Sequence, residues 1–337
     1  MITHDRITMD DPPAIAGLVF RPFRGPADFP AMVPLINRCN AAIGEEWVET
    51  EDSLTREYAH LSDSDPYRDM VLAEVEGQLV GYSRGWWYEE QDGPLLYGAV
   101  VFLDPDWQGR GIGRGMVRWM ESRQREIAAA YAPERSKYFQ RYVTDKDHWQ
   151  TALMVSEGYR PERYTFQMVR PTLDDIPDFP LPDGLELRPV RPEHYRLIWD
   201  ADYEAFQDHW GYSPPTEEKY QAWLANETIF QPDLWQIAWD VATNEIAGQV
   251  RTFIDWVANR KHNHARGYTE FISVRRPWRR RGLARALIAE SLRVQRARGM
   301  TSSALGVDTE NLSGATRVYE DCGFRVESTS TIYRKPL

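Results

Sequence analysis

The chain has 337 residues, of which 42% are hydrophobic and 27% charged, and its formal net charge is −11. This length predicts two domains of ordinary size, and the composition excludes a disordered or membrane-spanning chain. The acidic balance disfavours bulk nucleic-acid binding, and only two cysteines, Cys39 and Cys322, exclude a disulfide scaffold. Without a long apolar run or a signal-peptide pattern, we expect a soluble cytoplasmic protein with no membrane or nucleic-acid partner.

The N-terminal half is predicted to contain an arm and one domain. Residues 1–17 are expected to form a flexible arm, and residues 18–170 a domain. The domain opens with a short strand ending in Arg-Pro and continues through a helix near residues 27–40. Apolar strands are expected at Met70–Val75, Leu79–Trp86 and Leu95–Leu103. A glycine-rich turn then leads directly from the last of these strands into a helix.

A linker and a second domain follow. Residues 171–186 contain four prolines and five acidic residues without apolar periodicity, which is typical of an exposed linker. Residues 187–337 repeat the order of the first domain, beginning with a helix near residues 192–208. The remaining expected elements are strands at Leu234–Trp239, Glu245–Ile254, Tyr268–Val274, Ser303–Val307 and Phe324–Tyr333, and a short helix at Ser313–Asp321. The last strand is expected to close this second domain.

The two halves share three sequence matches in the same order. They are Leu18–Phe23 with Leu185–Val190, Leu103–Gly113 with Val274–Ala284, and Glu157–Tyr159 with Cys322–Phe324. Their offsets of 167, 171 and 165 residues are nearly constant, which predicts two copies of one domain. Strands interleaved with helices favour a mixed, mainly antiparallel α/β sheet flanked by helices.

Each copy places small residues at the turn from strand to helix. The turn reads Gln108-Gly109-Arg110-Gly111-Ile112-Gly113 in the first copy and Arg279-Arg280-Arg281-Gly282-Leu283-Ala284 in the second. Small residues let a bound group approach the backbone, and the N–H groups and dipole of a helix start favour an anion. The span Arg275–Arg298 adds nine arginines and one glutamate. The turn therefore indicates a pyrophosphate site, although tight packing alone also explains such residues.

The turn resembles the acetyl-CoA loop of the GCN5-related N-acetyltransferase superfamily, which follows the pattern Gln/Arg-x-x-Gly-x-Gly/Ala after a strand. The dinucleotide fingerprint and the P-loop pattern are not met. Downstream, the second copy carries Asn311, Ala315, Tyr319 and Gly323-Phe324 at the spacing that the superfamily uses. The resemblance covers residues 268–324 well and the rest of the second copy loosely. It implies two tandem acyl-CoA N-acyltransferase domains.

The resemblance also implies where acetyl-CoA would bind as co-substrate. Backbone groups of Ile272, Ser273 and Val274 would contact its pantetheine arm, and Asn311 would form a hydrogen bond with it. The pyrophosphate would lie on Arg279, Arg280, Arg281, Gly282, Leu283 and Ala284. The first copy could bind a second molecule through Gln108, Gly109, Arg110, Gly111, Ile112 and Gly113. No metal is expected, because His262 and His264 lack acidic or cysteine partners nearby in the sequence.

The resemblance further implies two catalytic candidates in the second copy. Tyr319 would protonate the departing thiolate, although a packed helical tyrosine is the alternative. Glu270 lies in an apolar strand, so partial burial would raise its pKa and make it a suitable general base. An ion pair with an arginine is the alternative for Glu270, and a chain of water molecules could also act as the base.

The first copy lacks these candidates. The positions four and six residues before Leu103 are Ala99 and Tyr97, which are not carboxylates. Aligned from Gly158, Met154 and Lys146 stand where the second copy has Tyr319 and Asn311. We therefore expect a degenerate first copy and an N-acetyltransferase that acetylates a primary amine of a small molecule by direct attack in the second. A non-catalytic acetyl-CoA sensor or scaffold is the alternative. A monomer or a homodimer is expected.

Overall fold

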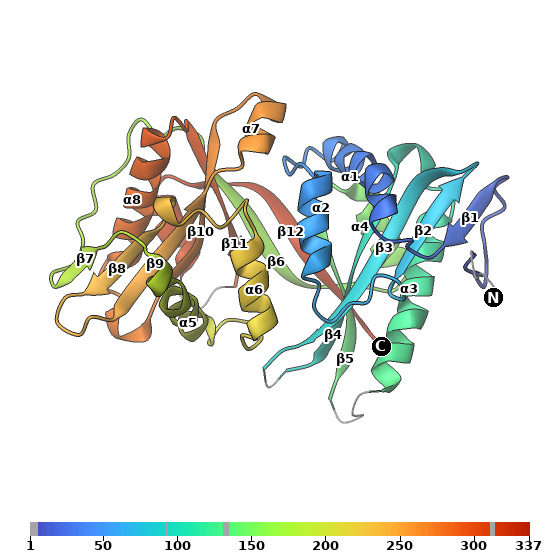
Figure 1. The fold of residues 1–337 in the computed structure, drawn as a ribbon, viewed down its shortest axis with the longest axis horizontal. Coiled ribbons are helices and arrows are strands. Elements are labelled where there is room, and N and C mark those ends of the chain that lie inside the picture. The colour runs from blue at the N-terminus through green and yellow to red at the C-terminus, as the bar shows by residue number, and fades with distance from the viewer. Residues whose placement is uncertain (1–5, 92, 131–134, 311–313) are drawn as a thin grey trace. The chain divides into compact units, whose positions relative to one another are not determined.

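The computed structural model describes residues 6–91, 93–130, 135–310 and 314–337. The chain forms two compact units (Figure 1), which we call unit 1 (Met1–Arg163 and Ser330–Leu337) and unit 2 (Tyr164–Thr329). In the residues just given, no helix combines the length and the apolar character that spanning a bilayer requires. Both units are mixed α/β structures with a mostly antiparallel sheet and flanking helices, as the sequence predicts.

The sheet of unit 1 has the strand order β1-β2-β3-β4-β5-β12. Its strands are β1 (Leu18–Arg21), β2 (Met70–Val75), β3 (Gln78–Glu89), β4 (Leu95–Leu103), β5 (Lys137–Thr144) and the end of β12 (Arg325–Pro336). The pairing of β4 with β5 is parallel, and the other pairs of this sheet are antiparallel. A parallel pair needs a crossover, which the helix between β4 and β5 supplies.

Helices cover both faces of this sheet. The helices are α1 (Phe29–Ala42), α2 (Glu51–Ala59), α3 (Ile112–Ala129) and α4 (His148–Ser156), with 3-10 turns at Pro26–Asp28 and Pro105–Trp107. Side chains alternate along β2: Met70 and Leu72 pack with α1 and α2, whereas Val71 and Ala73 pack with α3 and α4. The unit therefore has two hydrophobic cores, one on each face of the sheet.

Unit 2 repeats this arrangement. Its strand order is β6-β11-β10-β9-β8-β7, and β10 pairs with β11 in parallel. The strands are β6 (Arg160–Arg170), β7 (Leu185–Leu187), β8 (Gln236–Asp240), β9 (Ile246–Phe253), β10 (Arg266–Val274) and β11 (Ser302–Asp308). The helices are α5 (Tyr195–Phe206), α6 (Glu217–Ala225), α7 (Trp256–His262), α8 (Leu283–Ala297) and α9 (Ala315–Asp321), with 3-10 turns at Pro192–His194, Pro232–Leu234 and Arg276–Trp278. Helices α5 and α6 pack on one face, and α8 and α9 on the other.

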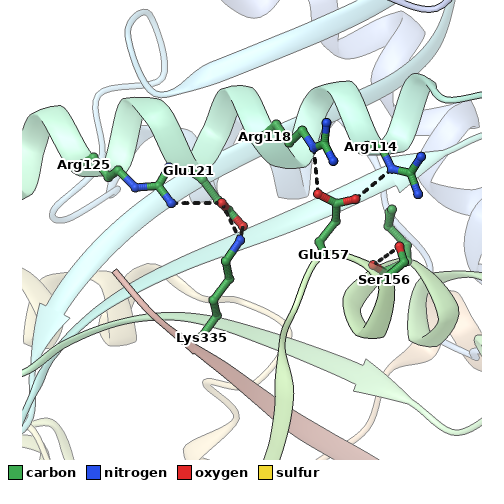
Figure 2. A network of polar contacts seen from close by, with 8 residues as sticks. Arg114, Arg118, Glu121, Arg125, Ser156, Glu157 and Lys335 are labelled. Atoms are coloured by element: carbon green, nitrogen blue, oxygen red, sulfur yellow. Dashed lines mark hydrogen bonds and ion pairs between the residues drawn. The ribbon is translucent and has the colours of Figure 1, made fainter. Parts of the chain in front are cut away.

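The closing strands are exchanged between the two copies of the sequence. Residues 165–170 of β6 pair with β11 of unit 2, and residues 330–336 of β12 pair with β5 of unit 1. Lys335 Nζ lies 2.8 Å from both carboxylate oxygens of Glu121 on α3, which fixes the end of β12 in unit 1 (Figure 2). The last strand of the second copy therefore does not close that copy, because it completes the sheet of the first.

Apolar side chains of the two segments expected to be loose lie in hydrophobic cores. Met9 is 8% exposed and belongs to the core of unit 1, and Ile7 N–H donates to Phe20 O. In the segment 171–186, Leu173 is 1% exposed and belongs to the core of unit 2. Most of the other residues of both segments are exposed or half-buried.

Candidate functional site

The site predicted for the second copy lies where β10 and β11 diverge. Their pairing covers Arg266 to Tyr268 of β10 and Ser302 to Ala304 of β11, although both strands continue beyond it. In unit 1, β4 and β5 likewise pair only from Leu95 to Gly98. Beyond these points the two central strands of each unit stop exchanging backbone hydrogen bonds. Backbone groups of β10 are thereby left available for a ligand.

Between Glu270 and Val274, strand β10 contains one residue more than the corresponding stretch of β4. Val274 lies opposite Gly248 and Glu270 lies opposite Arg251, so four steps along β10 match three along β9. The register of β4 against β3 is regular over the corresponding stretch. The extra residue is a β-bulge at Phe271, whose φ of 50° is left-handed. A bulge changes the direction in which neighbouring side chains point, and here the neighbour is Glu270.

Glu270 is half-buried and is bonded across the divergence of the two strands. Its Oε1 accepts a 2.7 Å hydrogen bond from Gly306 N–H, which lies on β11 across the divergence. Removal from water raises the pKa of Glu270 to about 8, against the opposing effect of hydrogen bonds from the N–H groups of Gly306 and Phe271. No arginine contributes to this shift, so the alternative of an ion pair has no support from the surroundings.

The bulge also corrects the comparison with the first copy. Counting back from the loop makes Ala99 the counterpart of Glu270. The strand register gives a different counterpart, Val100. Val100 lies opposite Arg84 of β3, and Glu270 lies opposite Arg251 at the equivalent position of β9. Unit 1 has no carboxylate at either position.

Tyr319 lies on α9 and is brought near Glu270. It is 7% exposed, and burial, followed by the negative charge of Glu270, raises the pKa of its phenol above the ordinary value. A phenol with a raised pKa stays protonated at neutral pH and can donate a proton. Its counterpart in unit 1, Met154, is fully buried and carries no proton to donate. The predicted ligand Asn311 lies outside the described residues.

The loop from Arg279 to Ala284 forms an open helix start. Gly282, with φ 86°, precedes the first residue of α8, Leu283, and a Cβ atom built on Gly282 would meet nothing within 4 Å. Arg280 also has a left-handed φ of 60° and is exposed, and within the described residues it has no hydrogen-bond or ion-pair partner. The N–H groups at this helix start and the Arg280 guanidinium together suit an anion.

Other arginines of the loop serve the protein itself. Arg279 Nε donates to Val274 O at 2.9 Å and Nη2 donates to Ala205 O at 2.9 Å, so this side chain fastens the loop to β10 and α5. Arg281 donates to Asp183 O at 3.1 Å. Most of the arginine excess in this region is neutralised by ion pairs, which are Arg275–Glu204, Arg276–Asp208, Arg285–Asp321, Arg293–Asp178 and Arg298–Asp233. The positive charge predicted from the sequence is thus much smaller at the surface.

Of the three β10 residues predicted to contact the pantetheine arm, Ile272 and Val274 direct their backbone groups toward β11. Arg275 N–H donates to Ala247 O, which continues the hydrogen-bonded pair of Ser273 with Gln249. Because bonding alternates along an antiparallel ladder, the N–H and C=O groups of Ile272 and Val274 point away from β9. Ser273 is turned to β9 instead, so its backbone is not placed for a ligand.

The corresponding loop of unit 1 has the same backbone but is covered. Gly109 and Gly111 have φ values of 72° and 90°, and Gly111 precedes α3. A Cβ atom on Gly111 would lie 3.2 Å from Pro13 of the N-terminal arm, and one on Gly113 would lie 2.6 Å from the Trp149 ring. Gln150, also on α4, donates to Val101 O at 3.5 Å, where Val101 is the counterpart of Ile272.

The remaining residues of that loop also have internal roles. Gln108 Nε2 donates to Leu103 O at 3.4 Å, as Arg279 does to Val274 in unit 2. Arg110 lies over the ring of Trp107, and Ile112 is fully buried. Farther along α3, Arg114 and Arg118 both donate to Glu157 (Figure 2).

The sequence did not indicate the groups that hold Glu270. Gly306 acts through its backbone N–H, and Phe271 acts through its conformation, so neither side chain reveals the role. The one available signal is the offset between the copies, which changes from 167 to 171 residues before the loop. The extra residue in the bulge of β10 accounts for one residue of that increase.

Similarity to known proteins agrees with the fold and with the resemblance of the loop. The family model described as "Acetyltransferase (GNAT) family" matches residues 30–136 and 193–324. A mycothiol acetyltransferase of Salinispora arenicola is 28% identical over 276 residues, which cover 80% of this chain and 82% of that protein. A solved GCN5-related N-acetyltransferase from Sphaerobacter thermophilus is 28% identical with a TM-score of 0.71, covering 98% of this chain and 97% of that one. A tandem GNAT protein from the clavulanic acid biosynthesis pathway, 15% identical with a TM-score of 0.67, covers 95% of this chain and 98% of its own and shares the fold.

Proposed function

The chain belongs to the GNAT family of acetyltransferases and is an acetyl-CoA-dependent N-acetyltransferase, and from this premise we propose that it acetylates a primary amine of a small molecule in unit 2. The observation that carries the proposal is the proximity of two groups at the divergence of β10 and β11. They are Glu270, whose pKa is raised to about 8, and the protonated Tyr319. Unit 1 offers neither group.

Glu270 is the general base of this proposal. An amine is protonated at neutral pH and must lose a proton before its nitrogen can attack a carbonyl carbon. A carboxylate whose pKa lies near 8 accepts that proton better than an ordinary glutamate does, because it is more basic. The N–H group of Gly306 holds the carboxylate in place during the transfer.

Tyr319 is the general acid. The departing thiolate needs a proton to become a thiol, and the Tyr319 phenol, whose pKa lies above its ordinary value, holds a proton at neutral pH. The alternative is that Tyr319 only packs between α9 and the sheet, since it is 7% exposed. Its electrostatic coupling to Glu270 favours the catalytic role, because a purely structural tyrosine has no need to lie near the base.

The residues of unit 2 fit acetyl-CoA, which is the usual co-substrate of this family and supplies an activated acetyl thioester when bound. The space over Gly282 is open, and the helix start of α8 and Arg280 provide donors for the pyrophosphate. The backbone of Ile272 and Val274 points toward the diverging strand, where an extended amide chain could form hydrogen bonds. Asn311 stays a prediction from the resemblance.

The test is turnover with a panel of amines. The purified full chain is mixed with acetyl-CoA and amino acids, amino sugars, polyamines or a lysyl peptide, and release of free thiol is followed. The curated relatives are named mycothiol acetyltransferases, so their amine acceptor is the first member of the panel. Turnover with one class of amine supports the proposal and identifies the acceptor. Binding of acetyl-CoA without turnover of any amine would favour a sensor or scaffold instead.

A further inference from the structure

The bulge of β10 needs an explanation in terms of its surroundings. Phe271 is an aromatic residue held at a φ of 50°, a region that costs a residue with a Cβ atom on the order of 1–2 kcal/mol. Such a conformation persists only where neighbouring groups hold it. In unit 1 the corresponding stretch of β4 is regular, so the fold itself does not demand the bulge.

A buried arginine lies against the strained residue. The guanidinium carbon of Arg251 is 4.3 Å from the centre of the Phe271 ring and 5.3 Å from the ring of Trp223 on α6. The Arg251 side chain is only 4% exposed, and its Nη2 donates to the carboxylate of Asp202 on α5. Arg251 thus connects both helices of this face to the bulge, directly opposite Glu270 in the ladder.

The buried position of Arg251 is unfavourable in free energy. Burial lowers the pKa of Arg251, and its Nε and Nη1 atoms have no hydrogen-bond partner within the described residues. A buried cation with unused donors loses free energy relative to an apolar residue of the same size. The contact with aromatic faces is what the guanidinium gains instead.

We propose that Arg251 and Asp202 are positioning residues, which hold Phe271 in its left-handed conformation and thereby aim Glu270 at the acceptor. The inference rests on the proposed role of Glu270 as the base. The link is the backbone, because Phe271 directly follows Glu270 and its left-handed conformation forms the bulge beside the carboxylate that bonds to Gly306 N–H. If Phe271 leaves its conformation, the bulge is lost and Glu270 loses its alignment with Gly306 N–H.

Unit 1 contains a matched control. Arg84 stands at the same register position, but it pairs with Glu57 and lies over the rings of Tyr58 and Trp86. Strand β4 has no bulge, so Arg84 has no bulged aromatic residue to hold. Arg84→Met therefore removes a similar arginine without affecting a base, and it should leave turnover unchanged.

The test is a double-mutant cycle in the full chain. Glycine adopts a left-handed φ without strain, so Phe271→Gly removes the need for a clamp. With acetyl-CoA and the panel amine that reacts fastest, Arg251→Met should lower kcat ten- to a hundredfold, with KM for acetyl-CoA within about twofold. In the Phe271→Gly background, the same substitution should change kcat less than threefold. Equal losses in both backgrounds, or no loss in either, would overturn the inference.

Two further measurements keep the outcome decisive. Exchange of the Gly306 amide proton should quicken in Arg251→Met but not further in the double variant, and this readout needs no turnover. If no amine reacts, the proposed function fails while the exchange data still decide the inference. Should Arg251→Met not fold, Arg251→Lys keeps the charge and lacks the planar face, so a smaller loss of kcat supports the inference and wild-type kcat contradicts it.

Discussion

Unit 1 and unit 2 have the same succession of strand, glycine turn and helix, yet they differ in what surrounds the turn. Gly282 of unit 2 faces open space, whereas Gly111 of unit 1 faces Pro13 of the N-terminal arm. Strand β10 has a bulge with Glu270 beside it, whereas β4 is regular and has Val100 at the same register position. The backbone of the loop is therefore not what distinguishes a candidate active site from a covered one.

The comparison teaches that few changes separate the two. One inserted residue in β10 changes the direction of Glu270, which then points toward β11. The Glu270 carboxylate is partly removed from water there, and its pKa rises. In unit 1, side chains of α4 occupy the corresponding space, since Trp149 covers Gly113 and Gln150 bonds to Val101 O. The same scaffold thus supports either a ligand or its own packing.

The largest expected effect comes from removing the base. Glu270→Gln should lower kcat on the order of a hundredfold or more, because the amide cannot accept the proton. In the wild type, kcat/KM should rise with pH up to about 8 and then level, since only the ionised carboxylate acts as a base. A pH titration of both proteins checks this. Val100→Thr, the matched change in unit 1, should leave the profile unaltered, and an identical rise in Glu270→Gln would assign it to the amine instead.

Blocking the loops should affect binding in only one unit. Gly282→Glu puts a negative side chain at the helix start of α8 and should weaken acetyl-CoA binding at least tenfold. A loss of that size corresponds to the free energy of about one charge-assisted hydrogen bond. Gly111→Glu carries a similar backbone strain, at φ 90° against 86°, but should not change binding. Titration calorimetry should find one acetyl-CoA per wild-type chain. Two equivalents would break the distinction between the units.

Removing the proposed acid should have a smaller effect. Tyr319→Phe deletes only the hydroxyl and should lower kcat about tenfold, because a thiolate leaves more readily than an alkoxide and needs less help. The dissociation constant of acetyl-CoA should stay within about twofold, since packing of the ring is retained. Stopped-flow measurement of thiol release, with binding measured separately, distinguishes the two quantities. A wild-type kcat would leave Tyr319 a packing residue like Met154.

The smallest effect is expected in the exchanged strand. Lys335→Met removes the contact of β12 with Glu121, whose side chain is 4% exposed, while Arg125 remains beside it (Figure 2). Loss of one partner of a partly exposed pair should lower the free energy of unfolding by about 1–2 kcal/mol. Urea unfolding measures this, and turnover should not change. A loss of turnover without a loss of stability would mean that unit 1 contributes to the reaction.

Much of the fold could be predicted from the sequence. The strands at residues 70–75, 95–103 and 302–308 follow from their apolar content, and the helix starting at Leu283 follows from its stripe of leucines. The exchange of β6 and β12 could not be predicted, because both strands follow the same Gly-Tyr or Gly-Phe motif and either could close either sheet. Long-range pairing is decided by three-dimensional packing rather than by local pattern.

The candidate site was predicted in part. Glu270 stands out as a carboxylate in an apolar strand, and removal from water is the main cause of its raised pKa. The burial of Met9 and the coverage of Gly111 by Pro13 depend on contacts between distant segments, so no local pattern indicates them. The roles of Phe271 and Arg251 depend on one positive φ and one ring contact, which only coordinates reveal.

The exchange of β6 and β12 has a consequence for how the protein can be divided. A cut within residues 171–186 would leave β5 without its neighbour β12, and β11 without its neighbour β6, in the respective fragments. Each fragment would carry the closing strand that the other one lacks. The two repeats are therefore not separable modules, and either could be transplanted or replaced only together with a strand encoded in its partner's half of the gene.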